Sequence, residues 1–127
     1  MKFNLIFLVF LAISCTTSGD IHGQEVEKTA LDSLKKEIKA LADESLCSDE
    51  NTCYSVGFGS KPCGGFWEYL VYSNSIEVVD FLAKIQNYNE LEKKYNDKYN
   101  ILSDCFLVMP PKETICENGK CKAVYLE

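Results

Sequence analysis

The chain has 127 residues, of which 46% are hydrophobic, 13 are Lys or Arg and 19 are Asp or Glu, so its formal net charge is −6. This length and composition fit one ordinary globular domain and exclude collagen-like, coiled-coil and disordered chains. The acidic balance leaves no basic patch that could neutralise a phosphate backbone, and we therefore expect no nucleic-acid partner.

The N-terminal residues 1–14 have the pattern of a secretory signal peptide. Lys2 precedes a nearly unbroken apolar run over residues 3–13, and the small residue Ser14 stands before Cys15. A membrane-spanning helix needs about 20 apolar residues, so this run is too short to be one. We expect residues 1–14 to be removed on export.

Cys15 is the predicted lipidation site. It follows Ala12, Ile13 and Ser14 in an order that resembles a lipobox, in which the cysteine after the cleavage site receives a diacylglyceryl group. Two or more acyl chains anchor a protein stably, so the expected membrane contact is a lipid anchor at Cys15. The alternative is an ordinary secretory signal in which Cys15 is incidental.

A polar segment and a helix follow. Residues 16–24 are small and polar with two glycines, which predicts a flexible tether over 15–24 and a single domain over 25–127. Over residues 25–46 apolar side chains recur every three or four positions, as on an amphipathic helix. They are Leu31, Leu34, Ile38, Leu41 and Ala42.

The middle of the chain predicts two strands and a second helix. Residues 54–58 alternate apolar and small side chains, and residues 66–72 are aromatic and β-branched, which suits a buried strand. Asn74 with Glu77 three positions later matches a capping box. From there a continuous apolar face predicts a helix to about Tyr99.

The C-terminal part predicts three more strand segments. Residues 105–109 form an apolar strand that Pro110 and Pro111 stop, and residues 113–116 and 121–126 form a hairpin. The turns between strands are too short for parallel crossovers. We therefore expect an α+β fold, with two amphipathic helices packed on one antiparallel sheet of four to five strands.

Besides Cys15 the chain has six cysteines, an even number that predicts three disulfides in an exported domain. We expect Cys116 to pair with Cys121, because an Asn-Gly turn places them opposite each other. Cys47 and Cys53 flank the short turn 48–52, which suggests that they pair with each other. Cys63 and Cys105 are then the remaining partners. No paired C-x2-C spacing with histidines is present, so no metal site is expected.

Catalytic chemistry has little support. The single histidine, His22, lies in the expected tether, where no neighbours would orient it for acid–base work. The even cysteine count leaves no free thiolate in the domain. Carboxylates remain, so the alternative to a non-catalytic protein is a small hydrolase with two carboxylates across a cleft. We expect no cofactor.

The candidate contact loop is residues 60–65, within the glycine-rich segment 57–65. It does not match a phosphate-binding loop, because Lys61 is followed by Pro62 and then by a strand. A turn whose glycines supply positive φ explains the composition, with Cys63 holding the loop for a partner. In a protease inhibitor Lys61 would enter the primary pocket. The predicted partner-binding residues are Ser60, Lys61, Pro62, Gly64 and Gly65.

With its Ser14-Cys15 terminus and its cysteine framework around CGGFWEYLVYS and SDCFLVMPP, the chain resembles small lipoproteins of unassigned function in Bacteroidota-type envelopes. The resemblance implies a location in the cell envelope, lipid-anchored and facing the periplasm or the exterior. It implies no activity. We expect a non-catalytic binding or inhibitor-like domain that contacts an envelope or extracellular protein.

Overall fold

The computed structural model describes residues 18–48 and 52–126 of an α+β chain. The expected signal peptide and Cys15 lie outside these residues. The elements in chain order are α1 (Ser18–Glu44), β1 (Cys53–Phe58), β2 (Glu68–Ser73), α2 (Val78–Tyr99), β3 (Glu113–Glu117) and β4 (Lys120–Val124).

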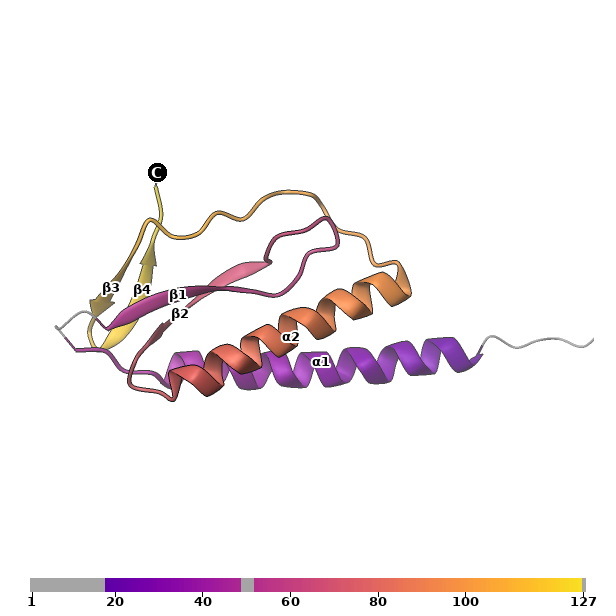
Figure 1. Cartoon of the computed structure of the whole chain (residues 1–127), viewed down its shortest axis with the longest axis horizontal. Coiled ribbons are helices and arrows are strands. Elements are labelled where there is room, and N and C mark those ends of the chain that lie inside the picture. Colours follow the sequence, from indigo (N-terminus) through magenta and orange to yellow (C-terminus); the bar gives the residue numbers. More distant parts are fainter. Residues whose placement is uncertain (1–17, 49–51, 127) are drawn as a thin grey trace, which may run out of the picture.

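Two helices and one two-stranded sheet enclose the core. Helices α1 and α2 run antiparallel beside each other, and β1 and β2 lie over them (Figure 1). Phe58 stacks on Tyr88 with ring centroids 4.7 Å apart, and Tyr72 meets Phe81 at 5.0 Å. The buried apolar residues all come from these four elements: Leu31, Ile38, Ala42, Phe58, Leu70, Tyr72, Phe81, Ile85 and Tyr88.

Helix α1 begins earlier than the sequence predicts. The segment from Ser18 to Gln24, expected to be a flexible tether, is already helical, and His22 is an exposed residue of this helix. Asp20 in the first turn complements the positive end of the helix dipole. Glu27 pairs with Lys98 near the end of α2, so the early part of α1 is also held by a contact between the helices.

Helix α2 ends as expected at Tyr99, but the predicted capping box is wrong. Glu77 occupies the N-cap and its side chain makes no capping hydrogen bond, while the backbone N–H of Asn74 donates to Thr52 O over 3.1 Å. At the other end Asn100 adopts the left-handed conformation, with φ of 51°, and its N–H bonds back to Asn96. That conformation stops the helix.

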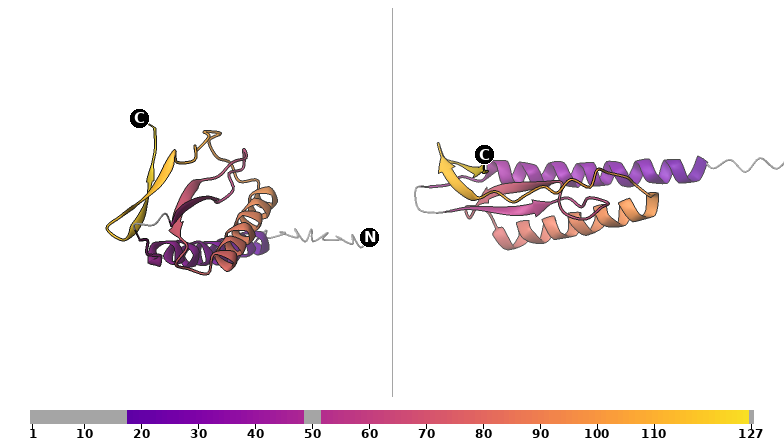
Figure 2. Two further views of the ribbon diagram at one scale, coloured as in Figure 1. Left: turned by 60° about the vertical axis from the view of Figure 1, so that its left-hand side comes forward. Right: turned by 90° about the horizontal axis from the view of Figure 1, so that it is seen from above.

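The single sheet of four to five strands is also wrong, because the strands form two separate two-stranded sheets. β1 pairs antiparallel with β2, and β3 pairs with β4 around Asn118 and Gly119. The predicted strand over residues 105–109 does not form. Pro110 and Pro111 have no N–H to donate to a ladder, and residues 101–112 instead run over the side of β1–β2 that faces away from the helices (Figures 1 and 2).

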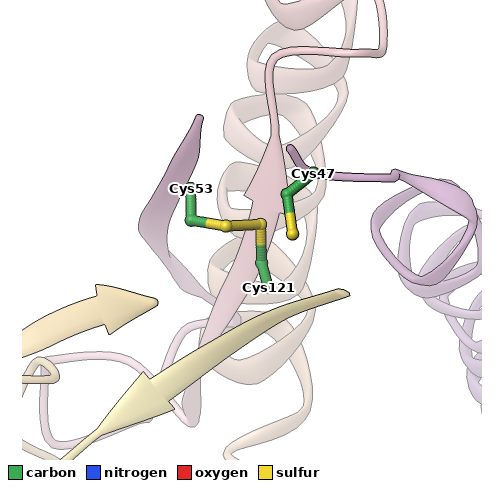
Figure 3. Close-up of side chains that lie close together, drawn as sticks. All are labelled: Cys47, Cys53 and Cys121. Carbon is green, nitrogen blue, oxygen red and sulfur yellow. A yellow bond between two sulfur atoms is a disulfide. The ribbon is translucent and has the colours of Figure 1, made fainter. Parts of the chain in front are cut away.

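Three disulfides cross-link the fold, and one predicted pairing is present. Cys63 is bonded to Cys105 as expected, whereas Cys47 is bonded to Cys116 and Cys53 to Cys121. Figure 3 shows the Cys47 sulfur beside the Cys53–Cys121 bond.

Cys116 and Cys121 do face each other in the hairpin register. The expected bond between them is nevertheless wrong, as is the bond between Cys47 and Cys53. The reason is that residues opposed across a hairpin point to the same face of the ladder, and that face of β3–β4 meets the start of β1 and the chain after α1. The two disulfides therefore attach the hairpin to the rest of the molecule instead of closing it on itself.

Candidate functional site

The contact loop, residues 60–65, is a tight turn fastened to helix α2. The Lys61 N–H donates to Gly65 O over 3.0 Å and the Gly64 N–H donates to Lys61 O over 2.9 Å. Gly64 and Gly65 have φ values of 94° and 83°, the positive φ that the sequence predicts for this turn. Both glycines are exposed, whereas Ser60 and Pro62 are half-buried.

Polar side chains of α2 hold the start of this loop. Ser60 donates its N–H to Glu92 Oε2 and its hydroxyl to Asn89 O, each over 2.6 Å, and its carbonyl accepts from Asn96 Nδ2 over 2.7 Å. Asn89 Oδ1 also accepts the N–H of Gly59 over 2.7 Å. Three hydrogen bonds from Ser60 and one from the preceding Gly59 therefore fix the position of the loop on α2 before any partner arrives.

Lys61 points inward and is not available to a protease pocket. Its side chain is 5% exposed, and its Nζ lies 2.8 Å from Asp104 Oδ1 and 2.7 Å from Phe106 O. The ammonium also lies 5.0 Å from the ring centroid of Trp67, over the face of the indole. The sequence predicts that Lys61 contacts a partner, but its side chain is nearly buried and its ammonium is already paired within the chain.

Asp104 is the counter-charge of this lysine. It is 67% exposed, and its Oδ1 accepts the Phe106 N–H over 3.0 Å as well as the bond from Lys61. The hydrogen bond from Lys61, followed by that from the Phe106 backbone, holds the pKa of the Asp104 carboxyl below its usual range. The ion pair and the Cys63–Cys105 disulfide thus join the contact loop to residues 104–106.

We call residues 102–109 the strap. Leu102, Phe106, Leu107 and Met109 are 91%, 80%, 66% and 62% exposed. Within the described chain, no residue of the strap makes a backbone–backbone hydrogen bond. Polar and covalent contacts therefore fix the position of this segment, and its large apolar side chains are left facing solvent.

The apolar composition of residues 105–109 predicts a strand and gives no sign that these side chains are exposed. A usable signal does exist in the residues around the predicted Cys63–Cys105 bond. Lys61 and Asp104 each lie within two positions of one of these cysteines. The bond between these two cysteines brings the opposite charges of Lys61 and Asp104 together.

The catalytic alternative calls for two carboxylates across one cleft, and one pair of described carboxylates lines a common hollow. Glu92 and Asp32 share a hollow of about 320 Å³. Both oxygens of Glu92 are hydrogen-bonded, to the Ser60 N–H over 2.6 Å and to the Tyr88 hydroxyl over 3.1 Å, and Asp32 pairs with Lys28. Glu92 therefore serves as a structural acceptor, and burial raises the pKa of Tyr88.

One cluster of cysteines has the spacing of a metal site. The Sγ atoms of Cys47, Cys53 and Cys121 lie within 4.8 Å of one another. All three sulfurs are in disulfides. A metal binds the thiolate, so these sulfurs act as cross-links in this structure.

The part of the chain that the structure describes contains no helix long and apolar enough to cross a bilayer. Comparison with protein-family models, with curated proteins and with solved structures finds no match for this chain.

Proposed function

We propose that this protein is a non-catalytic, protein-binding domain of the cell envelope whose contact surface is the strap together with the exposed glycines of the contact loop. The observation that carries the proposal is the exposure of Phe106, Leu107 and Met109 on a backbone that Lys61 and the Cys63–Cys105 bond hold in place. Contiguous exposed apolar side chains of this size mark interaction sites.

Two physical features favour a protein as the ligand. Large side chains such as phenylalanine and methionine dominate the central part of protein interfaces. The strap is also fixed before binding, so that little ordering entropy is lost when a partner covers it. A partner that buries these side chains would gain apolar contact without having to order the chain.

The proposed location is the cell envelope, with a lipid on Cys15 as the membrane anchor. Support comes from the signal-peptide pattern of residues 1–14 and from the six paired cysteines, which suit an oxidising compartment. In cells fed a clickable palmitate, we expect label on the wild-type protein and none on the Cys15→Ser variant. Absence of label from the wild type would remove the lipid anchor from the proposal.

Photocrosslinking tests the binding surface. We would place p-benzoylphenylalanine at Leu107 in cells of the source organism, with Lys36, an exposed residue of α1, as the control position. We expect a discrete protein adduct from position 107 and none from position 36. An adduct of twice the chain mass would identify the partner as a second copy.

A double substitution distinguishes a specific contact from nonspecific hydrophobic association. Phe106→Asp with Met109→Asp, added to the Leu107 crosslinker, should abolish the adduct. The denaturation midpoint should stay unchanged, because both side chains are exposed in the free protein. The same adduct from positions 107 and 36, or an adduct that survives the double substitution, would contradict the proposed contact surface.

A further inference from the structure

Helices α1 and α2 leave a groove between them, separate from the strap and the contact loop. It has a volume of about 420 Å³, within the range of small-molecule sites. The groove extends over about two helical turns of each helix, or roughly 10 Å. Its floor is apolar and is formed by Ala30, Leu31 and Leu34 of α1 with Leu91 and Tyr95 of α2.

The charged residues at this groove are Glu27, Lys94 and Lys98. Lys98 pairs with Glu27, and the hydrogen bond from Lys98 lowers the pKa of this glutamate, so the pair carries no net charge. Lys94 is exposed and has no ion-pair partner among the residues of 18–48 and 52–126. The groove therefore carries one uncompensated positive charge in a chain whose net charge is −6.

We infer that this groove binds a free fatty acid, with its alkyl chain along Leu31, Leu34 and Leu91 and its carboxylate at Lys94. An apolar floor with one cation at its edge matches a single-chain amphiphile with one anionic end. This ligand goes beyond the proposed protein-binding function, which uses other residues.

Calorimetric titration with ligands of one chain length tests the charge preference. We would titrate the purified protein with decanoate and with decylamine, which differ in the sign of the head group. We expect decanoate to bind up to about fivefold more tightly, the upper end of the range for one exposed charge interaction. Equal affinity for the two amphiphiles would overturn the inference.

Chain length tests the apolar floor. Each methylene removed between decanoate and hexanoate should weaken binding by up to about fourfold, the value for complete burial. Affinity that does not depend on chain length would show that the alkyl chain is not in the groove, and would also overturn the inference.

Matched variants test whether the ligand binds in the groove. Lys94→Glu should weaken decanoate binding about fivefold or more, while Lys36→Glu, an exposed charge reversal on α1 outside the groove, should leave it unchanged. Leu91→Asp should abolish binding, with Val79→Asp as the control at an exposed residue of the same helix. Unfolding midpoints of all four variants show that the fold is retained.

Two further results would overturn the assignment. One is decanoate binding that survives both Lys94→Glu and Leu91→Asp. The other is binding to phosphatidylglycerol vesicles that requires the same two residues, because the ligand would then be a membrane lipid rather than a free fatty acid. Neither result bears on the crosslink from Leu107, so the two proposals fail independently.

Discussion

Lys61 is the residue on which the position of the strap depends. Its Nζ makes hydrogen bonds to Asp104 and to the carbonyl of Phe106, and it lies over the Trp67 ring. A lysine is seldom buried unless it is paired, and here the pairing joins two segments that are far apart in sequence. The Lys61 ammonium therefore stabilises the fold, and it is not exposed for contact with another protein.

Replacing this lysine should loosen the strap without disturbing the core. We expect Lys61→Met to lower the free energy of unfolding by about 2 kcal/mol, because a charged hydrogen-bond donor and a cation–π contact are lost at similar side-chain volume. Lys36→Met, at an exposed site, should change nothing measurable. Chemical denaturation measures both values. A Lys61→Met protein as stable as wild type would show that the ion pair does not hold the strap.

Asp104 makes this attachment sensitive to acid. Its pKa is lowered in the folded protein by the Lys61 hydrogen bond, so the ionised carboxylate stabilises the fold above its ordinary pKa of 3.8. That contribution is lost as the pH falls through the lowered folded pKa. Denaturation midpoints between pH 6 and pH 2, roughly the range that brackets carboxylate titration, should fall more steeply for wild type than for Asp104→Asn. Parallel curves would contradict this role.

At the scale of the elements, the β3–β4 hairpin is attached mainly by covalent bonds. None of the buried apolar residues belongs to β3 or β4. The hairpin is linked to β1 by the Cys53–Cys121 bond and by the Thr114 hydroxyl, which donates to Cys53 O over 2.7 Å. It is linked to the end of α1 and the chain after it by the Cys47–Cys116 bond, by the Cys47 N–H, which donates to Gly119 O over 3.0 Å, and by Lys120, which donates to Asp43 O. These two disulfides close nearly the same long loop, with sequence separations of 69 and 68.

The two bonds should therefore act non-additively. Replacing either pair by serines should cost about 3 kcal/mol, because the other bond still closes the long loop, and replacing both pairs should cost about 7 kcal/mol. Equilibrium denaturation of the three variants measures the difference. Equal, independent losses of about 4 kcal/mol for each bond would show that the two cross-links do not share one loop.

Local patterns predict most of the elements but not their assembly. The amphipathic face of α1, the run to Tyr99 in α2 and the Asn118-Gly119 turn each depend on neighbouring residues, and each forms. The strand over residues 105–109 fails because apolar composition alone does not tell a sheet strand from a segment held by Lys61 and Cys63. The pairings of Cys116 and Cys121 fail because opposed residues in a hairpin need not be bonded to each other.

The same contrast between local patterns and long-range assembly applies to the candidate site. The tight glycine turn can be predicted from residue type and spacing, and it is present. The Cys63–Cys105 bond is also present, but the sequence predicts it only as the pair that remains after two other pairings, both of which are wrong. The inward direction of the Lys61 side chain and the exposure of Phe106 arise only when the loop, α2 and the strap are assembled. Long-range placement of this kind is not encoded in a short window of sequence.

The whole molecule has two parts that differ in what holds them together. Helices α1 and α2 with β1–β2 share the apolar core, whereas the hairpin and the strap are fixed by disulfides and polar contacts (Figure 1). Hydrophobic burial does not depend on redox conditions, but a disulfide does. The two parts should therefore respond differently to a reductant.

Hydrogen exchange measures this difference. After reduction with a dithiol and alkylation, backbone amides of β3 and β4 should lose their protection, while amides around Phe81, Ile85 and Tyr88 in α2 keep theirs. Untreated protein is the control. Simultaneous loss of protection in α2 would show that the cross-links support the core itself, and that the protein has one cooperative unit.

The arrangement of Cys116 opposite Cys121 has a consequence for how the protein matures. In an unfolded chain short loops close at the lowest entropic cost, so we expect the bonds Cys116–Cys121 and Cys47–Cys53 to form first. The native bonds then require thiolate attack on these early products. The final step is eased because three of the sulfurs meet within 4.8 Å. In an oxidising solution, the reduced chain should therefore reach its native pairing faster with a disulfide isomerase than with an oxidant alone.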